Sequence, residues 1–376
     1  MTITALSLTI NRAFLSRYEP TRSTLRAVIA QAGGATGDVM VTTLTRQTAG
    51  ADLLLTTITT TLGVIPALST QVEIRLDTLK DADGVSTVRV SQALGDYTLR
   101  VTAGAVSAEA NFTVAPITPE SLKSSYMRGI PLTGSSGATL DDEAMMEEVL
   151  RNYAYVVMML HTDLEPTTVV TEKILEGPNA PASYDRIGEP VGFYRQEATM
   201  RWLAFQVPYR NLLKIHQIQG WFNLQKAVDI TPEWQVKNTM SSLVQLVPSN
   251  HAILQWQFLG VGIQAFLVGQ MQIPNFWQYH VTVGLRAIPL EILQFIGKRA
   301  AMSLLSVLGA LYYAPGVVST SLSRDGVSES RSLNPKGVYG ALIDAFDRDT
   351  GRDKDGKEAL LLKFRARYAG MSFTTL

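Results

Sequence analysis

The chain has 376 residues, more than a single hydrophobic core usually organises, so two domains are expected. Its 33 basic and 33 acidic side chains cancel, which leaves no overall positive charge to attract nucleic acid. The absence of cysteine excludes disulfides, thiolate metal sites and a thiol nucleophile.

The first hundred residues have the pattern of a β protein. The opening segment MTITALSLTINR has no basic region and no long apolar run, so a secretory signal is not expected. From Ser23 to Pro116, short β-prone runs alternate with turn residues. These runs predict strands at 23–31, 38–46, 71–76, 85–92, 97–103 and 108–114.

The last two of these runs form a predicted hairpin. Gly95-Asp96 leads into a strand in which Tyr97, Leu99 and Val101 share one face. This reading, Gly-x-Tyr-x-Leu-x-Val, resembles the final strands of bacterial and phage immunoglobulin-like domains. The resemblance implies an all-β, immunoglobulin-like sandwich over residues 1–117.

A connector and a helix follow this first domain. Residues 118–140 are rich in Pro, Ser and Gly and are expected to be a linker. Thr139 then offers a capping side chain before three carboxylates, which suit the positive end of a helix. Apolar residues recur at three- and four-residue steps to about His161, so a helix is predicted near 141–163.

The remaining chain, 141–376, predicts a second domain that mixes helices and antiparallel strands. Residues 168–285 return to β-like runs. Pro289 suits the first turn of a helix near 289–312, whose charged residues favour a buried amphipathic helix over a membrane span. Asn334-Pro335 is expected to cap a helix near 335–346, and a last helix is expected near 357–368. The predicted fold class is therefore α+β.

The candidate chemical sites all have a simpler structural interpretation. The acidic run Asp347, Asp349, Asp353, Asp355 and Glu358 departs from the calcium-loop pattern and is interleaved with basic residues. The four histidines lack the i, i+4 spacing of a metal pair, and neither a nucleophile elbow nor a phosphate loop occurs. The sequence therefore predicts no catalytic residue, no cofactor and no metal site, and no enzymatic activity.

The C-terminal third carries a distinctive series of motifs. A helix beginning Ile-Pro leads into a serine-rich segment, and a final helix contains Leu362, Lys363, Arg365 and Tyr368 before Gly370. The positions of the serine-rich motif are Ser321, Ser323, Asp325, Gly326, Ser328 and Ser330. This series resembles the C-terminal portion of virion proteins from the neck, or head-to-tail connector, of tailed bacteriophages.

The resemblance implies a non-enzymatic subunit of a dodecameric ring that joins the portal and capsid to the tail. Expected partners are further copies of the chain, portal protein, a tail terminator and other neck and capsid proteins, with passive contact to packaged DNA and no membrane. The implied location is the virion neck, after assembly in the host cytoplasm. The serine-rich segment, whose small polar residues predict an exposed loop or a hairpin turning at Asp325-Gly326, would be the assembly loop.

Two other interpretations stay open at this level. The immunoglobulin-like domain is absent from minimal connectors, which leaves a baseplate, tail or capsid-decorating role. A surface-binding adhesin is the other alternative, which would use the immunoglobulin-like domain and exposed members of the many aromatic residues between 202 and 279. A β-rich core or subunit interface uses the same aromatic residue types.

Overall fold

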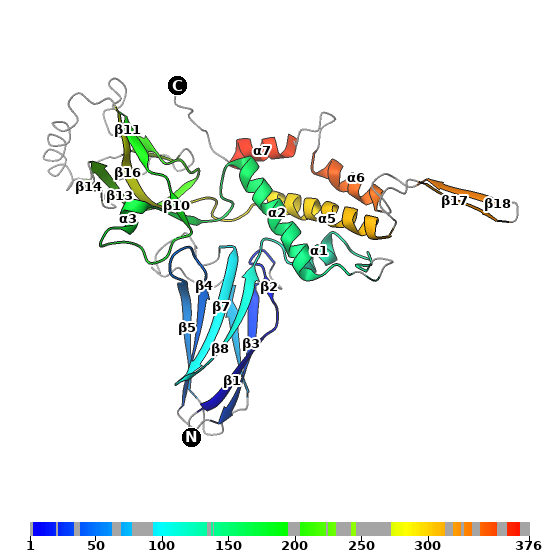
Figure 1. Cartoon of the computed structure of the whole chain (residues 1–376), viewed down its shortest axis with the longest axis horizontal. Helices are drawn as coiled ribbons and strands as arrows, with labels where there is room; N and C mark the ends of the chain where they lie inside the picture. Colours follow the sequence, from blue (N-terminus) through cyan, green and yellow to red (C-terminus); the bar gives the residue numbers. More distant parts are fainter. Residues whose placement is uncertain are drawn as a thin grey trace.

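The protein is an α+β structure in which two N-terminal sheets join a third sheet and a layer of helices (Figure 1). The computed structural model describes residues 3–19, 22–33, 38–61, 69–76, 93–133, 137, 139–194, 204–222, 225–230, 242–245, 272–312, 319–324, 327–332, 339–351 and 359–368.

The N-terminal part consists of two sheets. One has the strand order β1-β3-β6 and is antiparallel throughout. The other has the order β2-β8-β7-β4-β5, in which β2 is parallel to β8 and all other neighbours are antiparallel. The strands are β1 Ile3–Ile10, β2 Phe14–Leu15, β3 Thr24–Gly33, β4 Val39–Arg46, β5 Leu53–Thr61, β6 Ser69–Arg75, β7 Gly95–Ala103 and β8 Val106–Val114.

A shared hydrophobic core holds these two sheets together. In β4 and β7 every second residue is buried, as expected for strands with one face on a core. Leu25 and Ile29 from one sheet meet Leu44, Leu99 and other buried side chains from the other in a single cluster. Burial of this apolar surface is what stabilises the pair of sheets.

Five of the predicted N-terminal strands are confirmed as β3, β4, β6, β7 and β8. The predicted strand at 85–92 lies outside the described residues. β1, β2 and β5 were not predicted. β5, LLLTTITTT, is an edge strand on which no residue is fully buried, so its sequence lacks a clear alternation of apolar and polar residues.

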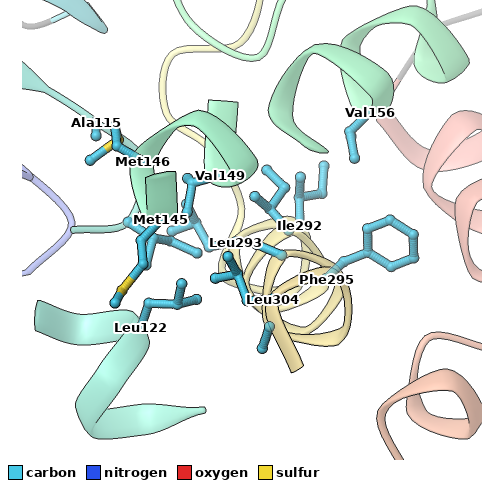
Figure 2. Close-up of a cluster of buried hydrophobic side chains, with 14 of the residues drawn as sticks. Ala115, Leu122, Met145, Met146, Val149, Val156, Ile292, Leu293, Phe295 and Leu304 are labelled. Carbon is cyan, nitrogen blue, oxygen red and sulfur yellow. The ribbon is translucent and has the colours of Figure 1, made fainter. Parts of the chain in front are cut away.

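The helical layer is built around α5, Leu290–Tyr312, which packs against α2 and α6. Figure 2 shows Val149 and Val156 of α2 with Ile292, Leu293 and Phe295 of α5 in one buried cluster. The other helices are α1 Pro119–Ser125, α2 Asp142–Leu160, α3 Glu172–Leu175, α6 Gly340–Asp349 and α7 Ala359–Tyr368.

The predicted helices near 141–163, 289–312 and 357–368 are confirmed as α2, α5 and α7, with shifted ends. The cap of α2 is Asp141 and not Thr139, because the Asp141 carboxylate accepts the Ala144 N–H at 2.7 Å. The helix predicted at 335–346 is α6, and its N-cap is Tyr339 and not Asn334.

Two further expectations concern burial. The segment expected to be a linker, 118–140, begins with α1, and its Leu122 and Met127 are buried in the core of the helical layer.

α5 is the one described helix long and apolar enough to cross a membrane, over Leu290–Gly309, and 61% of that segment is buried inside the protein. α5 is therefore the core helix of this layer, in agreement with the predicted buried helix.

The third sheet lies beside the helices. Its order is β10-β9-β16-β13-β14, with β11 also paired to β16, and β12 and β15 form a separate pair. The strands are β9 Thr167–Thr171, β10 Arg186–Gly188, β11 Val191–Tyr194, β12 Ala204–Gln206, β13 Leu212–Phe222, β14 Gln225–Ile230, β15 Leu243–Gln245 and β16 Gln272–Val283.

A buried polar network joins the N-terminal sheets to the rest of the chain. The Glu165 carboxylate, 3% exposed, lies 3.3 Å from the Arg17 guanidinium and accepts a 2.5 Å hydrogen bond from the Tyr18 hydroxyl. It also accepts the Leu94 N–H at 2.6 Å, while the Tyr18 oxygen accepts the Ile288 N–H. Burial raises the pKa of Glu165, and the charge of Arg17 opposes that shift.

A second contact fixes the same junction from the side of the third sheet. Arg46 of β4 forms an ion pair with Asp185, whose carboxylate also accepts the Thr168 N–H. Backbone hydrogen bonds from Ala49 and Ala51 reach the 182–184 segment. Because these contacts join segments more than a hundred residues apart, they set the orientation of the N-terminal sheets relative to the other layers.

Gly284 lies where two segments of the backbone approach each other closely at this junction. Its φ is +106°, and a Cβ there would lie 2.1 Å from the backbone oxygen of Glu165. We predict that Gly284→Ala lowers the free energy of unfolding by roughly 2–5 kcal/mol, from backbone strain and overpacking together. Chemical denaturation measures the change.

Gly104→Ala is the matched control. Gly104 also has a positive φ, +60°, but a Cβ added there would meet no atom within 4 Å. The substitution should cost only about 1 kcal/mol, the strain of a left-handed residue. Equal losses for the two variants would show that the close approach to Glu165 is unimportant.

Candidate assembly surface

The serine-rich segment forms a two-stranded ribbon. β17, Ser319–Arg324, pairs antiparallel with β18, Val327–Ser332, from Arg324↔Val327 at the tip to Ser319↔Ser332 at the base. Two residues, Asp325 and Gly326, connect the strands and lie outside the described residues. Figure 1 shows the ribbon extending away from the helical layer beyond α6. Of the two forms expected for this segment, a loop or a hairpin, the hairpin is the one found.

The register of the ribbon pairs serine residues with each other across the two strands. Three of its six pairs are serine with serine: Ser319↔Ser332, Ser321↔Ser330 and Ser323↔Ser328. Since neighbouring residues of a strand alternate between faces, these pairs share one face of the ribbon, and the other pairs share the opposite face. The predicted assembly residues Ser321, Ser323, Ser328 and Ser330 are therefore brought together on a single face.

The same register indicates which backbone groups point outward. A hairpin closed by two residues begins with a hydrogen-bonded pair, and bonded and non-bonded pairs then alternate. Arg324↔Val327 is the first pair, so the three serine pairs fall at the non-bonded positions. Their N–H and C=O groups point to the outer edges of the ribbon. Among the strands that the structure describes, none pairs with either edge.

The platform that carries the ribbon is rigidly packed. α6 contacts α5, and Lys298 of α5 forms a 2.9 Å ion pair with Asp349 at the end of α6. Phe346 packs edge-on against Tyr126. A Cβ at Gly297 would lie 2.5 Å from the Tyr126 ring, so this close contact requires glycine in α5.

The acidic run considered as a calcium loop has a structural role where it is described. Lys298 lowers the pKa of Asp349 by hydrogen bonding and charge. Asp347 lies on α6, and Asp353, Asp355 and Glu358 lie outside the described residues. Within the described ranges, no group of three or more His, Cys, Asp or Glu side chains is arranged to hold a metal ion.

Two of the histidines are brought together by the third sheet. The rings of His216 on β13 and His280 on β16 stack at 4.3 Å and 18°. The Nε2 atom of His216 lies 2.8 Å from the Thr282 hydroxyl. His161 ends α2 with a left-handed backbone, φ 50°, and His251 lies outside the described residues. The stack was not predicted, because its members lie 64 positions apart in the sequence.

Two other features were also missed at the level of sequence. Glu165, Arg17 and Tyr18 form the junction network, and nothing local distinguishes them from surface residues. α7 was predicted only as a helix, yet it presents Lys363, Arg365 and Arg367 as exposed cations and Leu362 at 55% exposure. A signal for α7 was available, since these residues have no acidic neighbour between 359 and 368.

Comparisons with known proteins add no assignment. No protein-family model and no curated protein matches the chain. One similar solved structure is the sporulation control protein Spo0M from Bacillus subtilis, at 9% identity, over 71% of this chain and 98% of that chain, with a TM-score of 0.21. A similarity at that TM-score carries no argument about fold or function.

The histidine stack predicts a pH-dependent stability. Burial, the neighbouring His216 and Lys214 lower the pKa of His280 from 6.5 to about 3. The unfolded chain therefore binds a proton between these values that the folded chain does not bind. The contribution of this site to the free energy of unfolding is fully present above pH 6.5 and is lost as the pH falls toward 3.

Between pH 6.5 and pH 5, we expect the free energy of unfolding of the wild type to fall by about 1–2 kcal/mol more than that of His280→Gln. Urea denaturation at the two pH values measures this difference. An identical pH response of both proteins would contradict the assignment.

Proposed function

We propose that the chain is a non-enzymatic virion structural protein that forms a ring in the head-to-tail connector of a tailed phage. The observation that carries the proposal is the β17–β18 ribbon, which extends from a packed helical platform and has outward-pointing backbone groups along both edges. Unpaired strand edges are templates for pairing with another chain. A two-stranded ribbon is also only marginally stable alone, so a neighbouring strand would stabilise it.

In this proposal, β17 of one copy pairs with β18 of the next. The serine pairs supply the free N–H and C=O groups, and their small side chains permit close approach of the neighbouring ribbon. Such a contact joins two different surfaces of the same subunit, and successive contacts of this kind close a ring when the rotation fits. Portal protein, a tail terminator and other neck and capsid proteins would meet the ring at its two faces.

For the N-terminal sheets we propose an immunoglobulin-like sandwich. The strand orders β1-β3-β6 and β2-β8-β7-β4-β5 support it, as does the parallel pairing of the short β2 with the last strand, β8. The buried Tyr97 hydroxyl donates a 2.6 Å hydrogen bond to the Ala93 carbonyl, four residues upstream. This bond resembles the tyrosine corner of such domains.

Alternative roles in the baseplate, the tail or capsid decoration use the same self-association and differ in the neighbouring proteins. The adhesin alternative is less favoured. Phe276, Trp277 and Tyr279, from the aromatic-rich region, are buried in the core of the third sheet and cannot present a binding face.

A proline substitution tests the ribbon contact without removing the ribbon. Proline at positions 321 and 330 removes two outward N–H groups, and proline is tolerated where a strand's N–H faces away from its partner. We expect Ser321→Pro/Ser330→Pro to abolish ring formation, measured by size-exclusion chromatography with light scattering, while circular dichroism stays unchanged.

The matched control is Ser321→Ala/Ser330→Ala, which removes the hydroxyls and keeps the backbone donors. It should assemble as wild type does. Deletion of 321–330 should give a folded monomer. Rings formed by the proline variant or by the deletion variant would show that the ribbon edges do not join the subunits.

A further inference from the structure

A ring needs two complementary surfaces on each copy, and the helical layer offers two of opposite charge. The first is the exposed stripe at the beginning of α2, where Glu143, Glu147 and Leu150 follow one another at helical spacing. Glu147 is 74% exposed and Leu150 is 39% exposed. The stripe is therefore acidic over its first turns, and the apolar Leu150 and the exposed Arg151, which is ion-paired with Glu147, follow.

The second surface lies on α7 and the pocket beside it. The pocket has a volume of about 370 Å³ and is lined by residues of α5, α6 and α7. Phe295 and Phe364 line it with their rings edge to face at 6.2 Å, but they are only 1% and 6% exposed, and the half-buried Leu360 is its more accessible apolar side chain. Its charged lining comprises the cations Lys298, Lys363 and Arg367 and the carboxylates Glu291 and Asp349, so one positive charge is in excess. Lys363 and Arg367 are one helical turn apart and exposed.

The two surfaces match in spacing as well as in charge. Glu143 and Glu147 are four residues apart on one helix, and Lys363 and Arg367 are four residues apart on another, so both pairs are separated by about 6 Å along their axes. Arg367 lies 3.3 Å from Glu291, and Glu147 lies 3.1 Å from Arg151. These ion pairs are exposed, contribute little to stability, and can exchange partners.

The positions of the surfaces exclude their meeting within one copy. α1 lies beside the beginning of α2, where Lys123 pairs with Asp142, and α7 lies beside the opposite end (Figure 1). α2 has 19 residues and is therefore about 28 Å long. Glu143 and Glu147 lie in the first two turns, at the end of α2 away from α7, so they are placed to reach the α7 pocket of another copy.

We propose that the acidic stripe of α2 docks on the α7 pocket of the next copy in the ring. Leu150 enters the pocket against the half-buried Leu360, while Glu143 and Glu147 face Lys363 and Arg367 at its rim. The contact is heterologous, as a ring requires. This inference rests on the proposed ring and adds a second contact between the subunits, separate from the ribbon.

Charge reversal tests the contact. Glu143→Lys/Glu147→Lys reverses one side and Lys363→Glu/Arg367→Glu reverses the other. Each variant alone should associate roughly 100-fold more weakly than wild type, because like charges then face each other. A matched control, Glu73→Lys/Glu109→Lys, makes the same change in net charge as the first variant on exposed residues of the N-terminal sheets and should assemble normally.

Mixing the two reversed variants in equal amounts should restore the ring, with the variants alternating around it. In that arrangement, the stripe of each variant faces a pocket of opposite charge on the other variant. Native mass spectrometry of the mixture distinguishes alternating rings from any residual self-association, and misfolded variants could not rescue each other.

Three results would overturn the inference. Reversed variants that assemble as the wild type does would contradict this contact and leave the proposed ring intact. A mixture of the two variants that does not form rings would have the same meaning. A wild-type chain that stays monomeric at every concentration would overturn the contact and the ring together.

Discussion

The buried carboxylate of Glu165 is the centre of the junction that orients the N-terminal sheets relative to the helices, and the Arg46–Asp185 ion pair supports that junction from the third sheet. The Glu165 carboxylate pairs with the Arg17 guanidinium and accepts hydrogen bonds from the Tyr18 hydroxyl and the Leu94 N–H. The segment after β2, the segment before β7 and the segment after α2 therefore meet at one group. Removal of one partner from a buried ion pair typically costs about 3–5 kcal/mol, because it leaves an uncompensated charge. The N-terminal sheets are therefore held at a fixed angle to the helices.

That fixed angle matters for the proposed assembly. The ribbon, the acidic stripe of α2 and the α7 pocket all belong to the helical layer or extend from it, whereas the N-terminal sheets project away from that layer (Figure 1). A copy that docks through the helical layer would hold its N-terminal sheets at a defined position around the ring. They are then free to contact capsid or tail proteins.

Local patterns predicted α2, α5, α6, α7 and five N-terminal strands, because amphipathic spacing can be recognised from the sequence alone. The stripe of α2 and the Asp325-Gly326 hairpin are examples. The short helices α1 and α3 were not predicted. The junction was not predictable, because Arg17, Glu165 and Ile288 converge only after three segments have folded. The cap of α2 was misplaced by two residues, since Thr139 and Asp141 are both good capping residues and only the geometry distinguishes them. The serine pairs were recognised as a motif, but their outward backbone groups follow only from the register.

The central claim is that this chain closes into a ring by itself. The most direct test is the native mass of the purified full-length protein, followed by negative-stain imaging of the species found. The account predicts a closed ring of about twelve copies with a protruding sheet domain on each copy. A stable monomer, trimer or hexamer at high protein concentration would contradict it.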